Sequence, residues 1–304
     1  MSTPARRLAL FLALAAFPAT ARPQTAVEQR RPAAPDGLVE IENAAGNIRV
    51  IGWGRAEVAV KGTLGHRADG LTFSGDGRRT RIEVEVQGNP HGVKSDLEIR
   101  VPAGSRVQID SFAASIAVGD VTGAVRAETV NGSITVTGAA KEVDVQSVNG
   151  SVEVKSPTPR VHAESVNGSV TIEEASGEVD ASTVNGRLVV SGRQLRRAHL
   201  ETVSGSLRFE GSLSGRATLD AETVSGCVEL VLPASISADF SASTFSGDIE
   251  NERGPSARRS SRHTSAKALS FRTGSGGAKV SVQTLSGAIR LLKREAGAKQ
   301  GETK

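Results

Sequence analysis

The sequence predicts an all-β protein with a single domain, a β-solenoid (β-helix or β-roll) whose coils of 18–21 residues contribute two strands each. A closely similar phrase occurs four times in succession, as VRAETVNGSITVTG, VDVQSVNGSVEVKS, VHAESVNGSVTIEE and VDASTVNGRLVVSG. The glycine of the Asn-Gly pair recurs every 18 residues. Apolar residues alternate with polar ones on both sides of this pair. Self-similarity at a fixed short period is typical of stacked repeats, in which each unit buries its apolar face only against its neighbours.

The alternation within one repeat indicates strands rather than helices. Val125 and Ala127 alternate with Arg126 and Glu128, which is the period of a half-buried strand. A coil of this length has room for two strands of about five or six residues and two tight corners, so we expect flat coils with two facing sheets. Asn-Gly readily supplies a positive φ at a corner. We therefore expect structural turns at Asn131, Gly132, Asn149, Gly150, Asn167, Gly168, Asn185, Gly186, Gly205, Gly226, Gly247 and Gly287.

Coils stacked at about 4.8 Å, the spacing of neighbouring strands, bring equivalent residues into columns. One inward column is expected to contain Val107, Val125, Val143, Val161, Val179, Ala198, Leu219, Phe240 and Val280. A second is expected to contain Ile116, Ile134, Val152, Val170, Leu188, Leu207, Val228, Ile249 and Ile289. Hydroxyls suited to bonding nearby backbone recur at Thr129, Ser147, Ser165, Thr183, Thr202, Thr223, Thr244 and Thr284. The asparagines of the turns are expected to form an amide ladder.

The N-terminal residues predict export from a bacterial cell. Residues 1–21 have the pattern of a signal peptide, with Arg6 and Arg7 before a ten-residue apolar run and a small-x-small cleavage site at Ala19-Thr20-Ala21. That run is too short to span a bilayer, and no later one is longer. We therefore expect no transmembrane segment, and a periplasmic, cell-surface or extracellular location. Residues 22–36 contain three prolines and predict a linker.

The solenoid is expected to span residues 37–292. Residues 37–106 predict irregular N-terminal coils and a cap, because the repeat is clear at 39–50 and then loosens. Residues 107–292 predict the regular array. After Gly186 the marker glycines are 19, 21 and 21 residues apart, and a gap of 40 then precedes Gly287. That gap predicts a solvated basic loop at 251–275, and residues 293–304 predict a charged tail.

The basic loop is one candidate binding region. A cluster of cations in a serine- and glycine-rich segment is suited to a polyanion such as envelope phosphate or an acidic polysaccharide. Its candidate residues are Arg253, Arg258, Arg259, Arg262 and Lys267.

The second candidate is an acidic, histidine-containing sheet face. Reading the outward columns along the repeats places carboxylates and imidazoles about 4.8 Å apart, at Glu128, Asp144, His162, Glu164, Asp180, His199, Glu201, Asp220 and Glu222. Such an array is able to bind cationic peptides, or to ligate Zn²⁺ or Ca²⁺. The alternative is a solvated face on which alternation avoids stacking like charges.

Composition and motifs argue against several function classes. The chain has a net charge of +4, no tyrosine and one tryptophan, which does not suit a nucleic-acid-binding surface. It contains no HExxH, GxSxG, paired-cysteine or phosphate-loop motif, so we expect no catalytic residues, no metal site of a known pattern and no cofactor. A polysaccharide-acting β-helix enzyme needs a wide coil with converging carboxylates, and coils of 18–21 residues are thin for that purpose.

The chain resembles the bacterial putative-adhesin domain family, a family of unknown function with a β-solenoid fold. The resemblance rests on the leader, on DLEIRVP at 96–102, on the repeated TVNGSI and T-x-SG units, and on VELVLP at 228–233. It covers roughly residues 39–292. It implies a cell-envelope or secreted location and a binding role, and the family pattern contains no catalytic residues.

These observations together predict an exported, non-catalytic binding or structural module of the bacterial cell envelope. Its expected partner is an envelope component, a polysaccharide or a peptide, and not nucleic acid. The expected oligomeric state is a monomer or a weakly self-associating chain. Two alternatives remain open: a sensor or binder of cationic peptides or metal ions that uses the acidic face, and a polysaccharide-acting enzyme.

Overall fold

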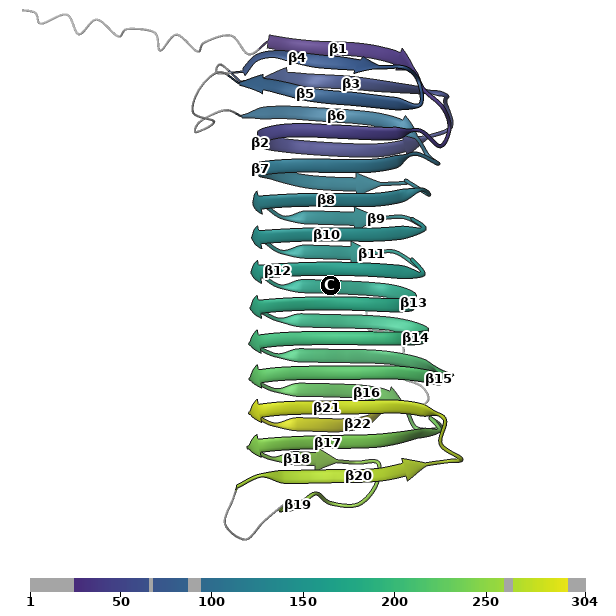
Figure 1. Ribbon diagram of the computed structural model, residues 1–304, viewed down its shortest axis with the longest axis vertical. Helices are drawn as coiled ribbons and strands as arrows, with labels where there is room; N and C mark the ends of the chain where they lie inside the picture. The colour runs from purple at the N-terminus through teal and green to yellow at the C-terminus, as the bar shows by residue number, and fades with distance from the viewer. Residues whose placement is uncertain (1–24, 66–67, 87–93, 260–264, 295–304) are drawn as a thin grey trace, which may run out of the picture.

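The protein is a straight stack of β-strands (Figure 1). The computed structural model describes residues 25–65, 68–86, 94–259 and 265–294, and all regular secondary structure in these ranges is strand. The prediction of an all-β solenoid is confirmed. No helix in the described ranges is long and apolar enough to cross a membrane. The expected signal peptide, residues 1–21, and residues 295–304 of the expected tail lie outside the described residues.

The regular array consists of parallel coils in the predicted register. Val143 pairs with Val125 on one side and with Val161 on the other, each one repeat away. The first face of the solenoid contains β8, β10 and β12, and the second face contains β9 and β11. Longer strands run round a corner and contribute to both faces. The strands of the array are β7 Arg106–Gly119, β8 Ala124–Asn131, β9 Ile134–Thr137, β10 Glu142–Asn149, β11 Val152–Lys155, β12 Arg160–Asn167, β13 Val170–Asn185, β14 Leu188–Ser204 and β15 Leu207–Ser225.

The core is a continuous double row of aliphatic side chains between the two faces. Val125, Val143 and Val161 are at most 1% exposed on the first face, and so are Ile134 and Val152 on the second. Burying one such side chain stabilises the fold by about 1.5–3 kcal/mol before the loss of conformational entropy is counted. A single coil has too few of them to fold alone, so each coil depends on its neighbours.

The corner glycines are needed because successive coils approach closely there. A Cβ added at Gly150 would lie closer than 3.0 Å to the carbonyl oxygen of Gly132, and one at Gly168 or Gly186 would meet the carbonyl of the preceding glycine in the same way. Gly150, Gly168 and Gly186 do not have a positive φ. Gly132 does have a positive φ, as expected for its Asn-Gly pair. At the other three positions steric contact between coils is the reason for glycine.

Two polar columns tie the same corner together. Hydroxyls of the Ser and Thr column donate to the carbonyl of the preceding coil's corner, with Ser147 Oγ 2.9 Å from Gly132 O and Ser165 Oγ 2.9 Å from Gly150 O. The amide ladder is confirmed, since Asn149 donates to Asn131 at 3.0 Å and Asn167 donates to Asn149 at 2.9 Å. The two columns therefore bond successive coils together between Ala114 and Asn185. Further along, Thr202, Thr223 and Thr284 are buried at the same position without a hydrogen-bond partner among the described residues.

The N-terminal end is closed by antiparallel strands. Its strands are β1 Thr25–Pro32, β2 Leu38–Trp53, β3 Glu57–Leu64, β4 Ala68–Gly75, β5 Arg79–Val86 and β6 Ser95–Pro102. β2 is the first coil, as predicted, and pairs with β7 so that Val39 meets Val107. β1 pairs antiparallel with β3, so the expected linker at 22–36 is wrong for residues 25–32. Pro32 is tolerated there because it is the last residue of β1, which is a short edge strand.

The C-terminal coils are not stacked in chain order. The strands are β16 Val228–Pro233, β17 Ala238–Ser246, β18 Ile249–Asn251, β19 Arg258–Arg259, β20 Lys267–Thr273, β21 Ala278–Ser286 and β22 Ile289–Arg294. β21 lies between β15 and β17, and β22 lies between β16 and β18. Val280 therefore follows Leu219 in the column and Phe240 comes last, which corrects the predicted order.

The expected basic loop at 251–275 is also wrong in its main part. β20 pairs antiparallel with β17 over Ala238–Thr244, and β19 pairs antiparallel with β20. Phe240 and Phe271 stack across this pairing with ring centroids 4.7 Å apart. Because β20 pairs with the outer edge of β17, β21 of the last coil in the sequence pairs with the opposite edge of β17.

We predict that Gly168→Ala lowers the free energy of unfolding by about 1–3 kcal/mol or more, the usual range for overpacking. The added methyl would collide with the backbone of Gly150, which has no room to move within the stack. Gly215→Ala is the control, since no atom lies within 4 Å of a Cβ built there. Chemical denaturation of both variants measures the difference, and equal midpoints would contradict the steric explanation.

Candidate functional site

The outward side of the first face carries two charged columns in the predicted register. Asp144 pairs with Arg126 and His162, and Glu128 pairs with Gln146. The first charged column contains Arg126, Asp144, His162, Asp180, His199 and Asp220. The second, called here the carboxylate column, contains Glu128, Gln146, Glu164, Ser182, Glu201 and Glu222. The structure thus brings together all nine residues of the predicted acidic face.

The carboxylate column is longer than the sequence indicated. Asp110 lies beside Glu128, Glu42 lies beside Asp110, and Glu83 lies beside Glu42. Four successive strands therefore present a carboxylate at the same position. Residues 39–50 follow the repeat, so Glu42 could have been found by alignment to Glu128. Glu83 could not, because β5 enters the stack through a hairpin that follows no repeat.

Cations next to the carboxylate column partly neutralise it. Arg126 forms ion pairs with Glu128 and Asp144, and its hydrogen bond to Glu128 is the main reason that the pKa of the guanidinium is raised. His162 Nε2 lies 3.2 Å from Glu164, and His199 Nε2 lies 2.8 Å from Glu201. These groups are well exposed, and exposed pairs of this kind contribute only about 0–1 kcal/mol each.

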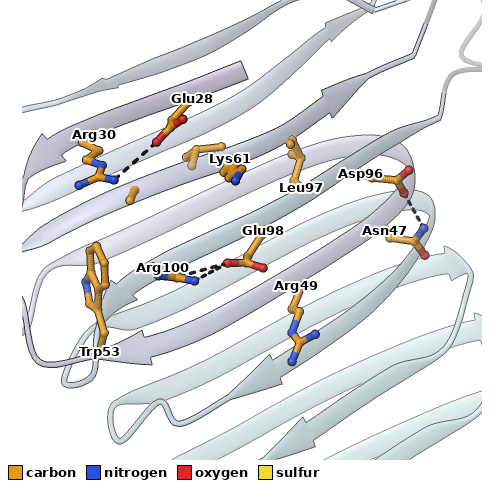
Figure 2. Close-up of a pocket in the computed structure, with 13 residues that line it drawn as sticks. Glu28, Arg30, Asn47, Arg49, Trp53, Lys61, Asp96, Leu97, Glu98 and Arg100 are labelled. Atoms are coloured by element: carbon orange, nitrogen blue, oxygen red, sulfur yellow. Dashed lines mark hydrogen bonds and ion pairs between the residues drawn. The ribbon is translucent and has the colours of Figure 1, made fainter. Parts of the chain in front are cut away.

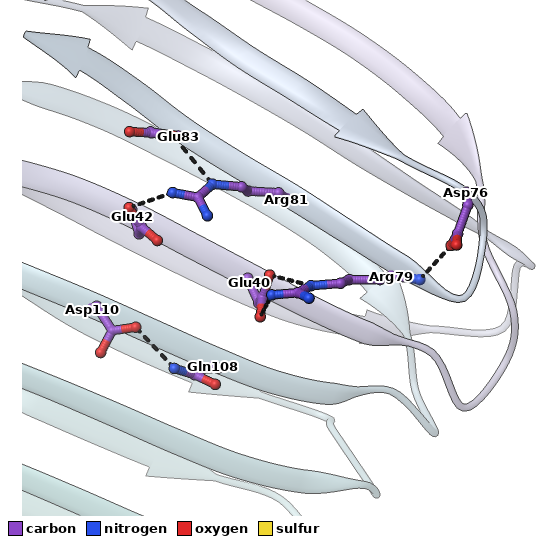
Figure 3. A network of polar contacts seen from close by, with 8 residues as sticks. All are labelled: Glu40, Glu42, Asp76, Arg79, Arg81, Glu83, Gln108 and Asp110. Carbon is purple, nitrogen blue, oxygen red and sulfur yellow. Dashed lines mark hydrogen bonds and ion pairs between the residues drawn. The ribbon is translucent and has the colours of Figure 1, made fainter.

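Figure 3 shows the same arrangement at the N-terminal end of the face. Arg81 bridges Glu42 and Glu83 at 3.0 and 3.1 Å, and Arg79 is bidentate to Glu40 at 2.7 Å for both bonds. Its hydrogen bonds to Glu40 raise the pKa of Arg79. In the adjoining turn Asp76 accepts the backbone N–H groups of residues 78 and 79, and these bonds lower the pKa of its carboxyl.

The face does not form a metal centre in the described part of the chain. No group of three or more His, Cys, Asp and Glu side chains is arranged there to hold an ion. The imidazoles of His162 and His199 contact carboxylates of their own strands instead. The metal-binding alternative therefore has no support from the geometry.

An exposed apolar row runs beside the carboxylate column, and sequence analysis missed it. Its members stand one residue before the turn, where the strand bends towards the corner, and all but one are 39–61% exposed. In spatial order they are Phe112, Val130, Val148, Val166, Val184, Val203, Val224, Leu285 and Phe245. The signal was present in the repeat, because an apolar residue follows a buried Ser or Thr in every unit.

The carboxylate column and the apolar row border one continuous groove. Two cavities of about 790 and 640 Å³ lie along them and share Ser182 and Val184. Val84 and Val86 of β5 line the N-terminal end of the groove, and Ala266 and Lys267 line the C-terminal end. The residues that line it include seven carboxylates and one lysine.

The residues of the predicted basic loop are not brought together as a site. Arg253 is half-buried, and its guanidinium donates to the carbonyl oxygens of residues 232, 233 and 292. Burial lowers its pKa. Lys267 forms an ion pair with Asp248, and Arg258 and Arg259 are exposed on β19. Arg262 lies outside the described residues.

A further pocket, of about 740 Å³, lies on the second face near the N-terminus (Figure 2). Glu28, Lys61, Glu98 and Arg49 occupy neighbouring positions on four adjacent strands, so their charges alternate. The ring of Trp53 is contacted by the guanidinium groups of Arg55 and Arg100. This arrangement is ordinary cross-strand charge pairing.

The model of the Toastrack DUF4097 family matches residues 39–292 of the chain. The chain belongs to this family. The match begins in β2, the first coil, and ends in β22, the last strand. It includes every residue of the groove, so the groove is a surface of the Toastrack domain itself.

Solved structures also resemble the Toastrack domain. They include a putative adhesin of Bacteroides fragilis NCTC 9343, with 11% identity over 88% of this chain and 96% of that one, at a TM-score of 0.45. Another is a putative lipid binding protein of Parabacteroides distasonis ATCC 8503, with 13% identity over 89% and 97%, at a TM-score of 0.35. Likenesses at this level support no argument about the ligand. No curated protein matches the chain.

We predict that Arg253→Ala destabilises the C-terminal end of the Toastrack domain by about 1–3 kcal/mol, because buried hydrogen bonds to a charged donor are lost. Faster hydrogen exchange in β20 and β22, with β8–β12 unchanged, is the expected result. Arg258→Ala removes an exposed arginine from the same segment and is the control. Equal exchange in the two variants would show that Arg253 is not needed to hold this end.

Proposed function

We propose that the protein is an exported, non-catalytic binding module of the bacterial cell envelope, and that the groove of the first face is its binding surface. The observation that carries the proposal is the apolar row. Eight large apolar side chains are 39–61% exposed in a single line, and contiguous exposed apolar surface marks interaction sites.

The fold itself does not require this row to be apolar. Core packing is supplied by the inward columns, which are almost completely buried, and the corner is held by glycine contacts and the polar columns. A polar residue at Val166 or Val184 would lose little packing. The largest members, Phe112 and Phe245, stand at the two ends of the row, and core packing does not account for either.

The groove is also unlike a hydrolytic site. Enzymes that cleave glycosidic bonds place two carboxylates on opposite sides of the substrate. Here the carboxylates stand in one column on one side, and the other side is apolar. This one-sided arrangement supports binding without catalysis. The signal-peptide pattern in the sequence of residues 1–21 supports export.

We predict that the chain from residue 22 co-sediments with envelope preparations through the groove. The test variant is Val148→Ser/Val166→Ser/Val184→Ser, which makes the centre of the row polar without touching the core. It is expected to reduce the sedimented fraction several-fold. The control is Val189→Ser, a partly exposed valine on the second face.

Cell fractionation tests export independently, with the protein expected outside the cytoplasm. Retention of the full-length chain in the cytoplasm would contradict export. Undiminished sedimentation of the triple variant would contradict the groove as the binding surface.

A further inference from the structure

We propose that the occupant of the groove is an amphipathic α-helix with an apolar stripe and Lys or Arg residues along one flank. This inference rests on the proposed function, because it names the class of partner for the same surface. It is carried by three properties of the groove: its charge, the state of its backbone and its repeat distance.

The charge of the groove selects a cationic partner. Its lining contains seven carboxylates and one lysine, and that lysine pairs with Asp248. Within the described residues Glu222 forms no ion pair, and Asp110 accepts a hydrogen bond from the side-chain amide of Gln108 and feels the charge of Arg126 without forming an ion pair with it. Lys or Arg side chains along one flank of the partner would form ion pairs with carboxylates of this column that have no ion-pair partner among the described residues. An anionic partner would meet like charge at most coils between Glu83 and Glu222.

The backbone of the groove excludes β-augmentation. An extended peptide gains affinity by pairing its backbone with a free sheet edge, but here each strand is already paired on both sides within the stack. An extended peptide lying across the strands would bring unpaired N–H and C=O groups against apolar side chains, which is unfavourable. A helix satisfies its own backbone, so only its side chains need partners.

The repeat distance of the groove suits a helix. Successive coils are about 4.8 Å apart, and successive helical turns are about 5.4 Å apart. A helix lying along the solenoid axis therefore places about one apolar side chain, at i, i+3/i+4 and i+7, against each valine of the row. The mismatch of about 0.6 Å per turn adds up to about half a coil over the four steps that separate the first and fifth turns, and five turns contain about 18 residues. A segment of about 18 residues is therefore the best-matched length.

The width of the groove suits the same partner. The carboxylate column and the apolar row are two residues apart on each strand, which is about 6.7 Å. A helix is about 10–12 Å wide with its side chains, so one helix covers both columns. Its apolar stripe would face Val148, Val166 and Val184, and its basic flank would face Glu128 and Glu164.

A second copy of this chain suits the groove less well. It would bring a carboxylate column of its own to the interface, next to the same apolar row. Among the described residues no complementary cationic stripe lies beside that row on either copy, because Lys267 is the one basic side chain in this part of the chain that lines the groove.

The test uses the chain from residue 22 and three labelled 18-residue peptides, with binding measured by fluorescence anisotropy. The first peptide has Leu at i, i+3/i+4 and Lys along one flank. The second has the same composition without helical periodicity, and the third has Glu in place of Lys. We expect the first to bind at least about tenfold more tightly than either control, which corresponds to about 1.4 kcal/mol, and to gain helical circular dichroism on binding.

Two sets of protein variants locate the site. Val148→Ser/Val166→Ser/Val184→Ser is expected to weaken binding of the first peptide at least about tenfold, since the residues near the centre of an interface carry most of the binding energy. Glu128→Gln/Glu164→Gln/Glu201→Gln is expected to weaken it and to reduce its salt dependence. Val189→Ser should leave it unchanged.

Several results would overturn the proposal. Equal affinity for the first two peptides would show that charge alone is recognised and that no helix is selected. Tighter binding of the Glu peptide would contradict the assigned charge. Failure of all peptides, with valine-dependent dimers in analytical ultracentrifugation, would assign the row to a second copy. Envelope sedimentation that depends on the row while no peptide binds would leave the proposed function standing and refute the helix alone.

Discussion

The structure depends on one steric constraint, the close approach of successive coils at a corner that has no space for a Cβ atom. At Gly150, Gly168 and Gly186 the backbone lies against the carbonyl of the preceding glycine. That contact fixes the distance between coils and brings the hydroxyl and asparagine columns within hydrogen-bonding range of the coil before. Because the register is fixed at every coil, the buried valines and isoleucines meet their equivalents and a continuous core follows. The outward residues become straight columns for the same reason.

The fold could be predicted from the sequence where the repeat is regular, because one unit specifies its own pairing with the next. The column from Val107 to Leu219, the amide ladder and the first coil at Val39 all follow from spacing alone. The failures lie where the pairing partner is not the adjacent repeat. β1 pairs with β3 across the cap, β20 turns back on β17, and β21 enters between β15 and β17. No local pattern records such a partner, because the contact depends on which strand edge is already occupied.

The candidate site could be predicted only in part, for a related reason. Alternation assigns every second residue to the surface, and it correctly placed Asp144, His162 and Glu164 there. It gives no weight to an apolar residue at an outward position, so Val148 and its equivalents were passed over. Their significance appears only when the stack shows that eight coils repeat the same exposure beside the carboxylate column. The prediction for the basic segment was wrong in the opposite sense. Arg253 was assigned to a solvated surface, but it donates hydrogen bonds within a partly buried cap.

The two charged columns depend on each other electrostatically. Carboxylates at equivalent positions of adjacent strands repel, and four stand in succession from Glu83 to Glu128. The neighbouring column supplies the compensation through Arg81 and Arg126, each of which contacts the carboxylate column from the side away from the groove. The two arginines therefore reduce the repulsion without lining the groove. If the two columns were exchanged, so that the cations stood next to the apolar row, the groove would lose its negative charge. The order of the columns across the strand is thus what allows one rigid surface to combine negative charge with an apolar row.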